Sequence, residues 1–272
     1  MIRDYYRFLW RLGPVELSKG MPYGRVVEYP AVVERLDLKP SDRLLDVGTR
    51  YSPLAQILAR RCGCTVRAID PEPDFRERQL KMARKVPWAR RLVEEGRIDF
   101  HVADAASLPF PDAHFTRISV ISVLEHIVDE RPVLRELARV LAPGGRLVVS
   151  VPFDPWRDEP EYMRTRTYVD GRPDEKRFYM RYYSIANLEQ RIVQPSGLEL
   201  ESSAYFGEPG FNAHNLLFGN ARIPWWLRRL LLQPFAPLAA RLFVRPLPPE
   251  RFRHKTKLYT ADIAVLVLHK RP

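Results

Sequence analysis

Between residues 42 and 153 the hydrophobic pattern alternates short apolar runs with longer segments of helical spacing. Short apolar runs of this kind are typical of strands that are buried on both faces. A helix starting near Ser52-Pro53, a charged helix over 74–95 interrupted by Pro87, and an amphipathic helix over 131–141 separate them. Strands separated by helices need crossover connections, which predicts a largely parallel sheet with helices on both faces. The expected strands are 43–47, 65–70, 98–104, 117–122 and 146–151.

The two ends of the chain extend this core. Residues 1–12 and 26–37 have helical spacing, with Pro14, Pro22 and Pro30 interrupting them. Two further strands are expected near the C-terminus, with about fifty residues and no neat crossover helix between them, and we expect the last to run antiparallel. We therefore expect one α/β domain with a seven-stranded, mostly parallel sheet. Its parts are an N-terminal helical cover (1–40), a core (41–153), a strand at 198–206, an insertion (208–257) and a last strand (258–271).

Composition limits the compartment and the metal chemistry. The chain has 272 residues, with 46% hydrophobic and 28% charged residues, as is usual for a globular protein. Only two cysteines occur, Cys62 and Cys64, which is too few for a disulfide framework and a poor metal site, so no metal is expected. No apolar run approaches the ~18 residues of a membrane-spanning helix. Charged residues interrupt the apolar residues at the N-terminus, so we expect no signal peptide there. We expect a cytoplasmic protein.

Polar residues gather where the predicted strands end. Asp70 ends the second strand and Asp104 ends the third. One such aspartate is often only a turn former or a helix cap. In open parallel sheets, however, ligands bind outside the carboxyl ends of the strands, so polar residues at successive ends predict one shared site. Asp46 and Gly48 after the first strand, and Ser122, Glu125 and His126 after the fourth, complete the set.

The order and spacing of five motifs across residues 42–153 resemble class I S-adenosylmethionine-dependent methyltransferases, whose fold is Rossmann-like. The motifs are LLDVGTRYSPLAQILA (44–59), VRAID (66–70), VADAASLPFPDAHF (102–115), ISVISVLEHI (118–127) and LRELARVLAPGGRLVVSVPF (134–153).

The resemblance implies a role for each residue at the carboxyl ends. Asp46 and the backbone around Gly48 would hold the methionine end of S-adenosylmethionine. Asp70 would accept hydrogen bonds from the ribose hydroxyls, and Asp104 with Ala105 would contact the adenine. Ser122 would line the sulfonium. The implied cofactor-binding residues are Asp46, Gly48, Thr49, Asp70, Pro71, Asp104, Ala105 and Ser122.

The loop after the first strand departs from the family. The usual G-x-G-x-G is replaced by Gly48-Thr49-Arg50-Tyr51-Ser52, with one glycine in place of three. Glycine allows positive φ and close approach to a ligand, so an inactive binding fold is one alternative. A dinucleotide-binding fold is another, but G-x-G-x-x-G is absent and Asp46 precedes the loop where a pyrophosphate would meet repulsion.

Methyl transfer to an oxygen benefits from a general base, and His126 is the candidate because it follows the fourth strand and titrates near neutrality. Glu125 has similar standing. Both can instead be structural, since L-E-H-I is frequent in this superfamily. Tyr179, Tyr182 and Tyr183 could form a wall of the acceptor pocket or serve only for packing.

The net charge of +11 is concentrated in residues 220–257, where nine Arg or Lys and one acid leave +8. Trp225, Trp226 and several Leu and Phe residues are interleaved with these charges. Such a mixture is typical of an amphipathic element on an anionic membrane, although a solvated structural insertion or a nucleic-acid contact would share it.

The segment YGRVVEYPAVVERL (23–36) resembles uncharacterised bacterial methyltransferases associated with surface-glycan genes. We therefore expect O-methylation of a small, glycan or lipid-linked acceptor, with peripheral contact to the inner face of the membrane. The alternatives are an RNA methyltransferase and a non-catalytic binding protein of the same fold.

Overall fold

The computed structural model describes residues 1–156, 161–163, 177–209, 224, 227, 232–252 and 262–272. Within these ranges the main sheet has eight strands in the order β3-β2-β1-β4-β5-β10-β8-β9. The first five strands in chain order pair in parallel, whereas β10 is antiparallel to both β5 and β8. The strands are β1 (Arg43–Val47), β2 (Thr65–Asp70), β3 (Ile98–Val102), β4 (Phe115–Ile121), β5 (Leu141–Pro152), β8 (Glu199–Gly207), β9 (Arg245–Pro246) and β10 (Ile263–His269).

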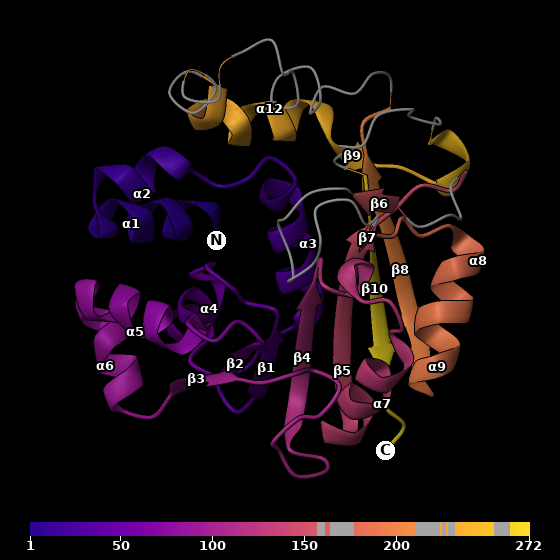
Figure 1. The fold of residues 1–272 in the computed structure, drawn as a ribbon, viewed down its shortest axis with the longest axis horizontal. Coiled ribbons are helices and arrows are strands. Elements are labelled where there is room, and N and C mark those ends of the chain that lie inside the picture. The colour runs from indigo at the N-terminus through magenta and orange to yellow at the C-terminus, as the bar shows by residue number, and fades with distance from the viewer. Residues whose placement is uncertain (157–160, 164–176, 210–223, 225–226, 228–231, 253–261) are drawn as a thin grey trace.

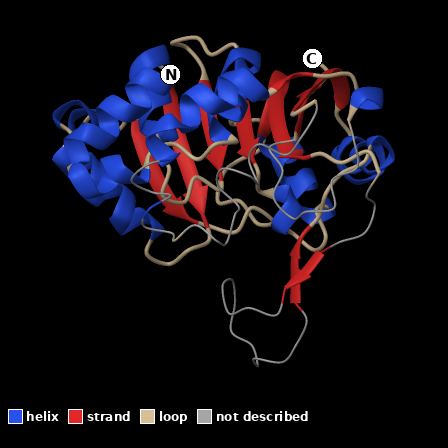
Figure 2. Ribbon diagram, turned by 90° about the horizontal axis from the view of Figure 1, so that it is seen from above, coloured by secondary structure: helices blue, strands red, loops and turns tan. Residues whose placement is uncertain are grey.

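Helices cover both faces of this sheet (Figures 1 and 2). Successive residues of a strand point to opposite faces, and accordingly Leu44 and Leu45 belong to two different apolar cores. One core packs under α1 (Ile2–Leu12), α3 (Arg25–Leu36), α4 (Leu54–Cys62), α5 (Phe75–Lys85), α6 (Pro87–Glu94) and α12 (Ala236–Phe243). The other packs under α7 (Arg131–Val140), α8 (Ile185–Leu188), a π-helical turn (Glu189–Val193) and α9 (Gln194–Ser196).

The remaining elements are short helices, turns and a second small sheet. Helix α2 (Pro14–Lys19) follows α1, and a 3₁₀ turn (Leu124–His126) follows β4. Strands β6 (Glu161–Met163) and β7 (Arg177–Met180) form a separate antiparallel pair that projects from the body in Figure 2. Two more 3₁₀ turns, Gln233–Phe235 and Pro249–Arg251, flank α12 and β9.

The mixed α/β fold, the mostly parallel sheet and the antiparallel last strand confirm the prediction from sequence. The number of strands was wrong, because the edge strand β9 has only two residues and no periodicity to reveal it. Pro30 lies inside α3 and does not break it, since buried Val26 and Val32 hold that helix on the sheet. Pro87 does end one helix, and it begins α6.

Most of the expected basic insertion lies outside the described residues, including Trp225 and Trp226. Its described part contains α12, which packs against α3. No helix among the described residues is long and apolar enough to cross a membrane.

The loop between β1 and α4 keeps its shape without the two missing glycines. Arg50 adopts a left-handed φ of 45°, a conformation that costs a non-glycine residue about 1–2 kcal/mol. The amide of Gln79, a buried residue of α5, donates to the carbonyl oxygens of Arg50 (2.8 Å) and Ser52 (3.1 Å). Gln56 of α4 donates in turn to Gln79 Oε1 at 2.8 Å. Side-chain hydrogen bonds therefore hold the conformation that glycines usually permit.

We predict that Gln79→Ala lowers the free energy of unfolding by about 2 kcal/mol, because the substitution leaves two partly buried carbonyl oxygens and the buried Gln56 amide without their partners. Urea denaturation followed by circular dichroism measures this loss. Arg76→Ala, an exposed position on the same helix, serves as the control and should change stability by less than about 0.5 kcal/mol. Equal stability of the two variants would show that Gln79 does not support the loop.

Candidate functional site

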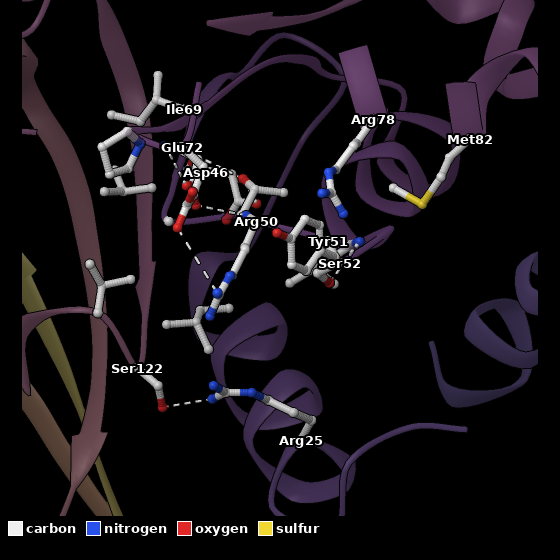
Figure 3. A pocket seen from close by; sticks show the side chains of 18 of the residues that line it. Arg25, Asp46, Arg50, Tyr51, Ser52, Ile69, Glu72, Arg78, Met82 and Ser122 are labelled. Atoms are coloured by element: carbon white, nitrogen blue, oxygen red, sulfur yellow. Dashed lines mark hydrogen bonds and ion pairs between the residues drawn. The ribbon is translucent and has the colours of Figure 1, made fainter. Parts of the chain in front are cut away.

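A cavity of about 1300 Å³ opens at the carboxyl ends of the parallel strands. Side chains from three directions line it: the ends of β1, β2 and β4, the N-terminal helices α1 to α3, and α5 (Figure 3). Small-molecule sites usually measure about 300–1,000 Å³, so this cavity is larger than a typical site for one ligand. All eight residues predicted to bind the cofactor line this one cavity, and so does His126.

Asp46, at the end of β1, is 3% exposed and faces the cavity. Its carboxylate accepts hydrogen bonds from Ser119 Oγ (2.6 Å) and Thr49 Oγ1 (2.8 Å). Burial raises the pKa of Asp46 to about 6, although these two hydrogen bonds oppose that shift. The Thr49 hydroxyl thus orients Asp46, a contact that the spacing along the sequence could not show.

Gly48 fills a position that no other residue could occupy without a shift of its surroundings. Its φ is +71°, and a Cβ atom there would lie 2.3 Å from Cγ2 of Val123. The amides of Gly48 and Thr49 both donate to the carbonyl oxygen of Ile69, which joins the ends of β1 and β2. This is the one glycine of the family motif that the chain retains, and its geometry explains why.

Asp70 ends β2 and is buried at the cavity wall. Its carboxylate accepts the backbone amides of Arg50 (2.9 Å) and Glu72 (3.1 Å). Burial raises the pKa of Asp70, while these amides lower it. A carboxylate has about four acceptor positions, so two remain for a diol.

The third strand end is more exposed. Asp104 and Ala105 line the cavity beside Pro71. Asp104 Oδ1 accepts the amide of Ala106 at 2.9 Å, which closes a turn after β3. Asp104 therefore forms a turn and faces the cavity at once, so the two interpretations of its position are compatible.

Ser122 follows β4 with a left-handed φ of 50° and belongs to a network that the sequence did not reveal. Its hydroxyl donates to Oε1 of Glu28 (2.7 Å) and accepts from Nη1 of Arg25 (2.6 Å). Glu28 is 1% exposed and also accepts from Ser150 Oγ (2.7 Å) and from Arg25. A buried carboxylate requires such partners, so α3 is tied to β4 and β5 by charge.

Arg25 contributes to the same wall, and Figure 3 shows its guanidinium directed to Ser122. Its neighbour on α3, Tyr29, also lines the cavity and donates to Ser52 Oγ at 3.0 Å. Ser52 Oγ accepts the amide of Leu54 as well, at 3.2 Å, at the start of α4. Residues 25–29 (RVVEY) thus form part of the cavity wall and also hydrogen-bond to its other residues. The sequence did not predict this, because an Arg–Glu pair three residues apart usually indicates a solvated helix face.

His126 lines the cavity from the 3₁₀ turn after β4. Its Nδ1 lies 2.9 Å from the backbone carbonyl oxygen of Tyr179. A carbonyl can only accept, so Nδ1 carries the proton and Nε2 is the unprotonated nitrogen. Burial lowers the pKa of His126, which keeps the ring neutral near pH 7.

Glu125 points elsewhere. It is 2% exposed and is absent from the cavity lining. Burial raises its pKa to about 8, and its Oε1 lies 4.0 Å from His126 Nε2. The structure places Glu125 behind His126, where it acts on a ligand only through its neighbours. Tyr182 and Tyr183 are also buried and do not line the cavity.

These residues fit the parts of S-adenosylmethionine that the resemblance implied. The cavity offers an acid for an ammonium at Asp46, an acid with spare acceptor positions for a diol at Asp70, and the backbone of Gly48 in its wall. Arg25 adds a cation beside Ser122.

Known proteins with similar sequences or folds include methyltransferases. Residues 45–149 match the family model described as a methyltransferase domain. A methyltransferase of Streptomyces halstedii, GfsG, is 40% identical over 117 residues, which are 43% of this chain and 40% of that protein. An O-methyltransferase of Pyrenophora dematioidea is 34% identical over 119 residues, 44% of this chain and 42% of the other. The chain spans less than half the length of the curated relatives it matches.

A ubiquinone/menaquinone biosynthesis C-methyltransferase of Ectopseudomonas mendocina is 32% identical over 120 residues, 43% of this chain and 44% of that one. Among solved structures, an S-adenosylmethionine-dependent methyltransferase of Methanosarcina mazei superposes with a TM-score of 0.57. It is 18% identical, and the match covers 89% of this chain and 98% of the other, so it supports the fold alone. The core of the chain, residues 45–149, therefore matches a methyltransferase domain, and the whole chain shares its fold with S-adenosylmethionine-dependent methyltransferases.

Proposed function

We propose that the protein transfers a methyl group from S-adenosylmethionine to an oxygen atom of a small acceptor. The observation that carries this proposal is that Asp46, Asp70, Asp104 and His126 line one cavity, which is large enough for a cofactor and an acceptor together. S-adenosylmethionine, once bound, supplies an activated methyl group. The protein has to bind the cofactor and the acceptor, align them and exclude water.

The cofactor residues are assigned by chemical match. Asp46 accepts from the ammonium, Asp70 accepts from the ribose hydroxyls, and Asp104 with Ala105 contacts the adenine. Gly48 and Pro71 also line the cavity and would contact the cofactor through their backbone. Arg25 offers a guanidinium to an anionic group beside Ser122. The hydrogen bonds from Thr49 and Ser119 favour the ionised form of Asp46 that this scheme requires.

His126 is assigned as the general base. Its Nδ1 donates to Tyr179 O, and its Nε2 takes the proton from the acceptor hydroxyl as the new oxygen–carbon bond forms and the sulfur–carbon bond breaks. The electron pair of the broken bond remains on sulfur. An imidazole base suits a hydroxyl acceptor, and this supports oxygen over carbon, although the relatives include enzymes named for each.

The class of acceptor is proposed as glycan or lipid-linked, with docking on an anionic membrane surface. Phe235, Leu238 and Leu242 expose their side chains along α12 and the turn before it, where Arg241 is also exposed. Apolar side chains flanked by cations on one face fit an anionic bilayer interface. The nucleic-acid alternative depends on the arginines and lysines of residues 220–257, many of which lie outside the described residues.

We predict that His126→Ala lowers methyl transfer by about 10²-fold, because it removes the base, while the affinity for S-adenosylhomocysteine changes less than about twofold. Transfer of tritium from labelled S-adenosylmethionine to a panel of glycosides and polyprenyl-linked sugars gives the rate. His114→Ala is the matched control, since His114 lies outside the cavity lining. Undiminished methyl transfer by His126→Ala would rule out His126 as the base. Absence of transfer by the wild type to every acceptor in the panel would count against the proposed class of acceptor.

We also predict that S-adenosylhomocysteine binds more weakly as the pH falls through about 6. Asp46 has a pKa of about 6, so it is ionised above that pH and loses its attraction for an ammonium as it gains a proton below it. The affinity should fall by about tenfold per pH unit there. Isothermal calorimetry from pH 5 to pH 8 measures this slope.

The control ligand is 5′-methylthioadenosine, which keeps the ribose and adenine but lacks the amino-acid chain. Binding of 5′-methylthioadenosine reports any titration of Asp70 separately. As the pH falls, its affinity should decrease much less than that of S-adenosylhomocysteine. Asp46→Asn should weaken S-adenosylhomocysteine at pH 7.5 by about 10-fold or more and remove the difference in slope. Parallel slopes for the two ligands in the wild type would contradict the assignment of Asp46.

A further inference from the structure

A buried ionic cluster lies behind the wall that carries His126. Its centre is Glu130, which is 1% exposed. The carboxylate accepts from the guanidinium of Arg181, from Arg191 Nη2 (2.6 Å) and Nε (3.1 Å), and from the hydroxyl of Tyr183 (2.8 Å). None of these four residues lines the cavity. The cofactor and acceptor roles assigned above leave this cluster without a function.

The cluster connects two segments that are far apart in sequence. Arg181 donates from its side chain to the carbonyl oxygens of Ile127 and Val128, each at 3.4 Å, and from its backbone amide to the carbonyl oxygen of Glu125 at 2.9 Å. Residues 125–130 after β4 are therefore held against the chain that leaves β7. Strand β7 itself packs on the 3₁₀ turn that contains His126.

The partner of His126 lies in this same stretch, two residues before Arg181. Tyr179 provides the carbonyl oxygen that accepts from His126 Nδ1, and the two rings meet edge to face with centroids 5.7 Å apart. Which imidazole nitrogen carries the proton depends on the hydrogen bond that the other one makes. The position of Tyr179 relative to the turn therefore decides the tautomer of His126.

We propose that Glu130 is a positioning residue which, through Arg181, holds the Tyr179 carbonyl against His126 and so fixes the Nδ1-protonated tautomer that leaves Nε2 as the proton acceptor. The effect of Glu130 on catalysis rests on the proposed function, whereas its effect on the tautomer of His126 does not depend on that function. A buried charge that loses its partner is strongly destabilised, so the ion pair keeps the two segments together rather than merely adjacent. The flanking Asp129–Arg131 pair is exposed and contributes no such constraint.

The test is nitrogen-15 NMR of the histidine side chains at pH 7, with His126→Ala used to assign the signals. In the wild type, His126 should show a protonated Nδ1 and an unprotonated Nε2. In Glu130→Gln the signal should move toward a mixture of tautomers, and kcat for methyl transfer should fall by about tenfold with KM for S-adenosylmethionine unchanged. Asp129→Asn, which removes an exposed acid from the neighbouring position, should leave both unchanged.

Arg181→Lys tests the same connection if Glu130→Gln fails to fold, because it keeps the positive charge but loses the forked contacts with Ile127 and Val128. It should shift the tautomer in the same direction. A wild-type His126 protonated on Nε2, or a folded variant of either kind with the wild-type signal, would overturn the proposal. If the wild-type protein does not bind S-adenosylhomocysteine, the proposed function is refuted, but the result on the His126 tautomer still holds.

Discussion

The hydrogen bonds that hold the loop between β1 and α4 are the constraint on which the rest of the site depends. Residues 48–52 contact both Asp46 and Asp70, and the hydroxyl of Thr49 donates to Asp46. The amide of Arg50 donates to Asp70, and the carbonyl of Arg50 accepts from Gln79. Because the loop has only one glycine, these bonds must offset the cost of the left-handed conformation at Arg50. Without them the loop would lose its support beside Asp46 and Asp70.

A second set of polar contacts attaches the helical cover to this frame. Glu28 of α3 accepts from Ser122 and Ser150 and pairs with Arg25, so the helix is held on the carboxyl ends of β4 and β5. Residues of α1 and α2, among them Tyr5, Leu9 and Lys19, then complete the cavity wall. The cover and the core are thus parts of one site, because Arg25 and Ser122, which both contact Glu28, also line the pocket. A substitution in α3 would act on ligand binding as well as on stability.

The sequence predicted the core strands closely because each is a short apolar run that ends in a polar or glycine residue, as at Val47-Gly48 and Asp70. It predicted that Asp46, Asp70 and Asp104 would meet, since parallel strands bring their ends to one edge. It could not predict the roles of Gln79, Glu28 or Glu130. Each sits in a helix or turn among other polar residues, and only the packing shows that it is buried and what it bonds. For Glu125, adjacency to His126 in sequence suggested the cavity, but the turn directs the two side chains differently.

Binding of S-adenosylmethionine in the cavity through Asp70 is the central expectation from this structure. Calorimetric titration of the wild-type protein and of Asp70→Ala with S-adenosylmethionine is the direct measurement, with Asp112→Ala, an exposed acid outside the cavity lining, as the control. We expect one saturable site in the wild type and in the control, and an affinity lower by about 10-fold or more in Asp70→Ala. No heat of binding in the wild type, or equal affinity in Asp70→Ala, would contradict this expectation.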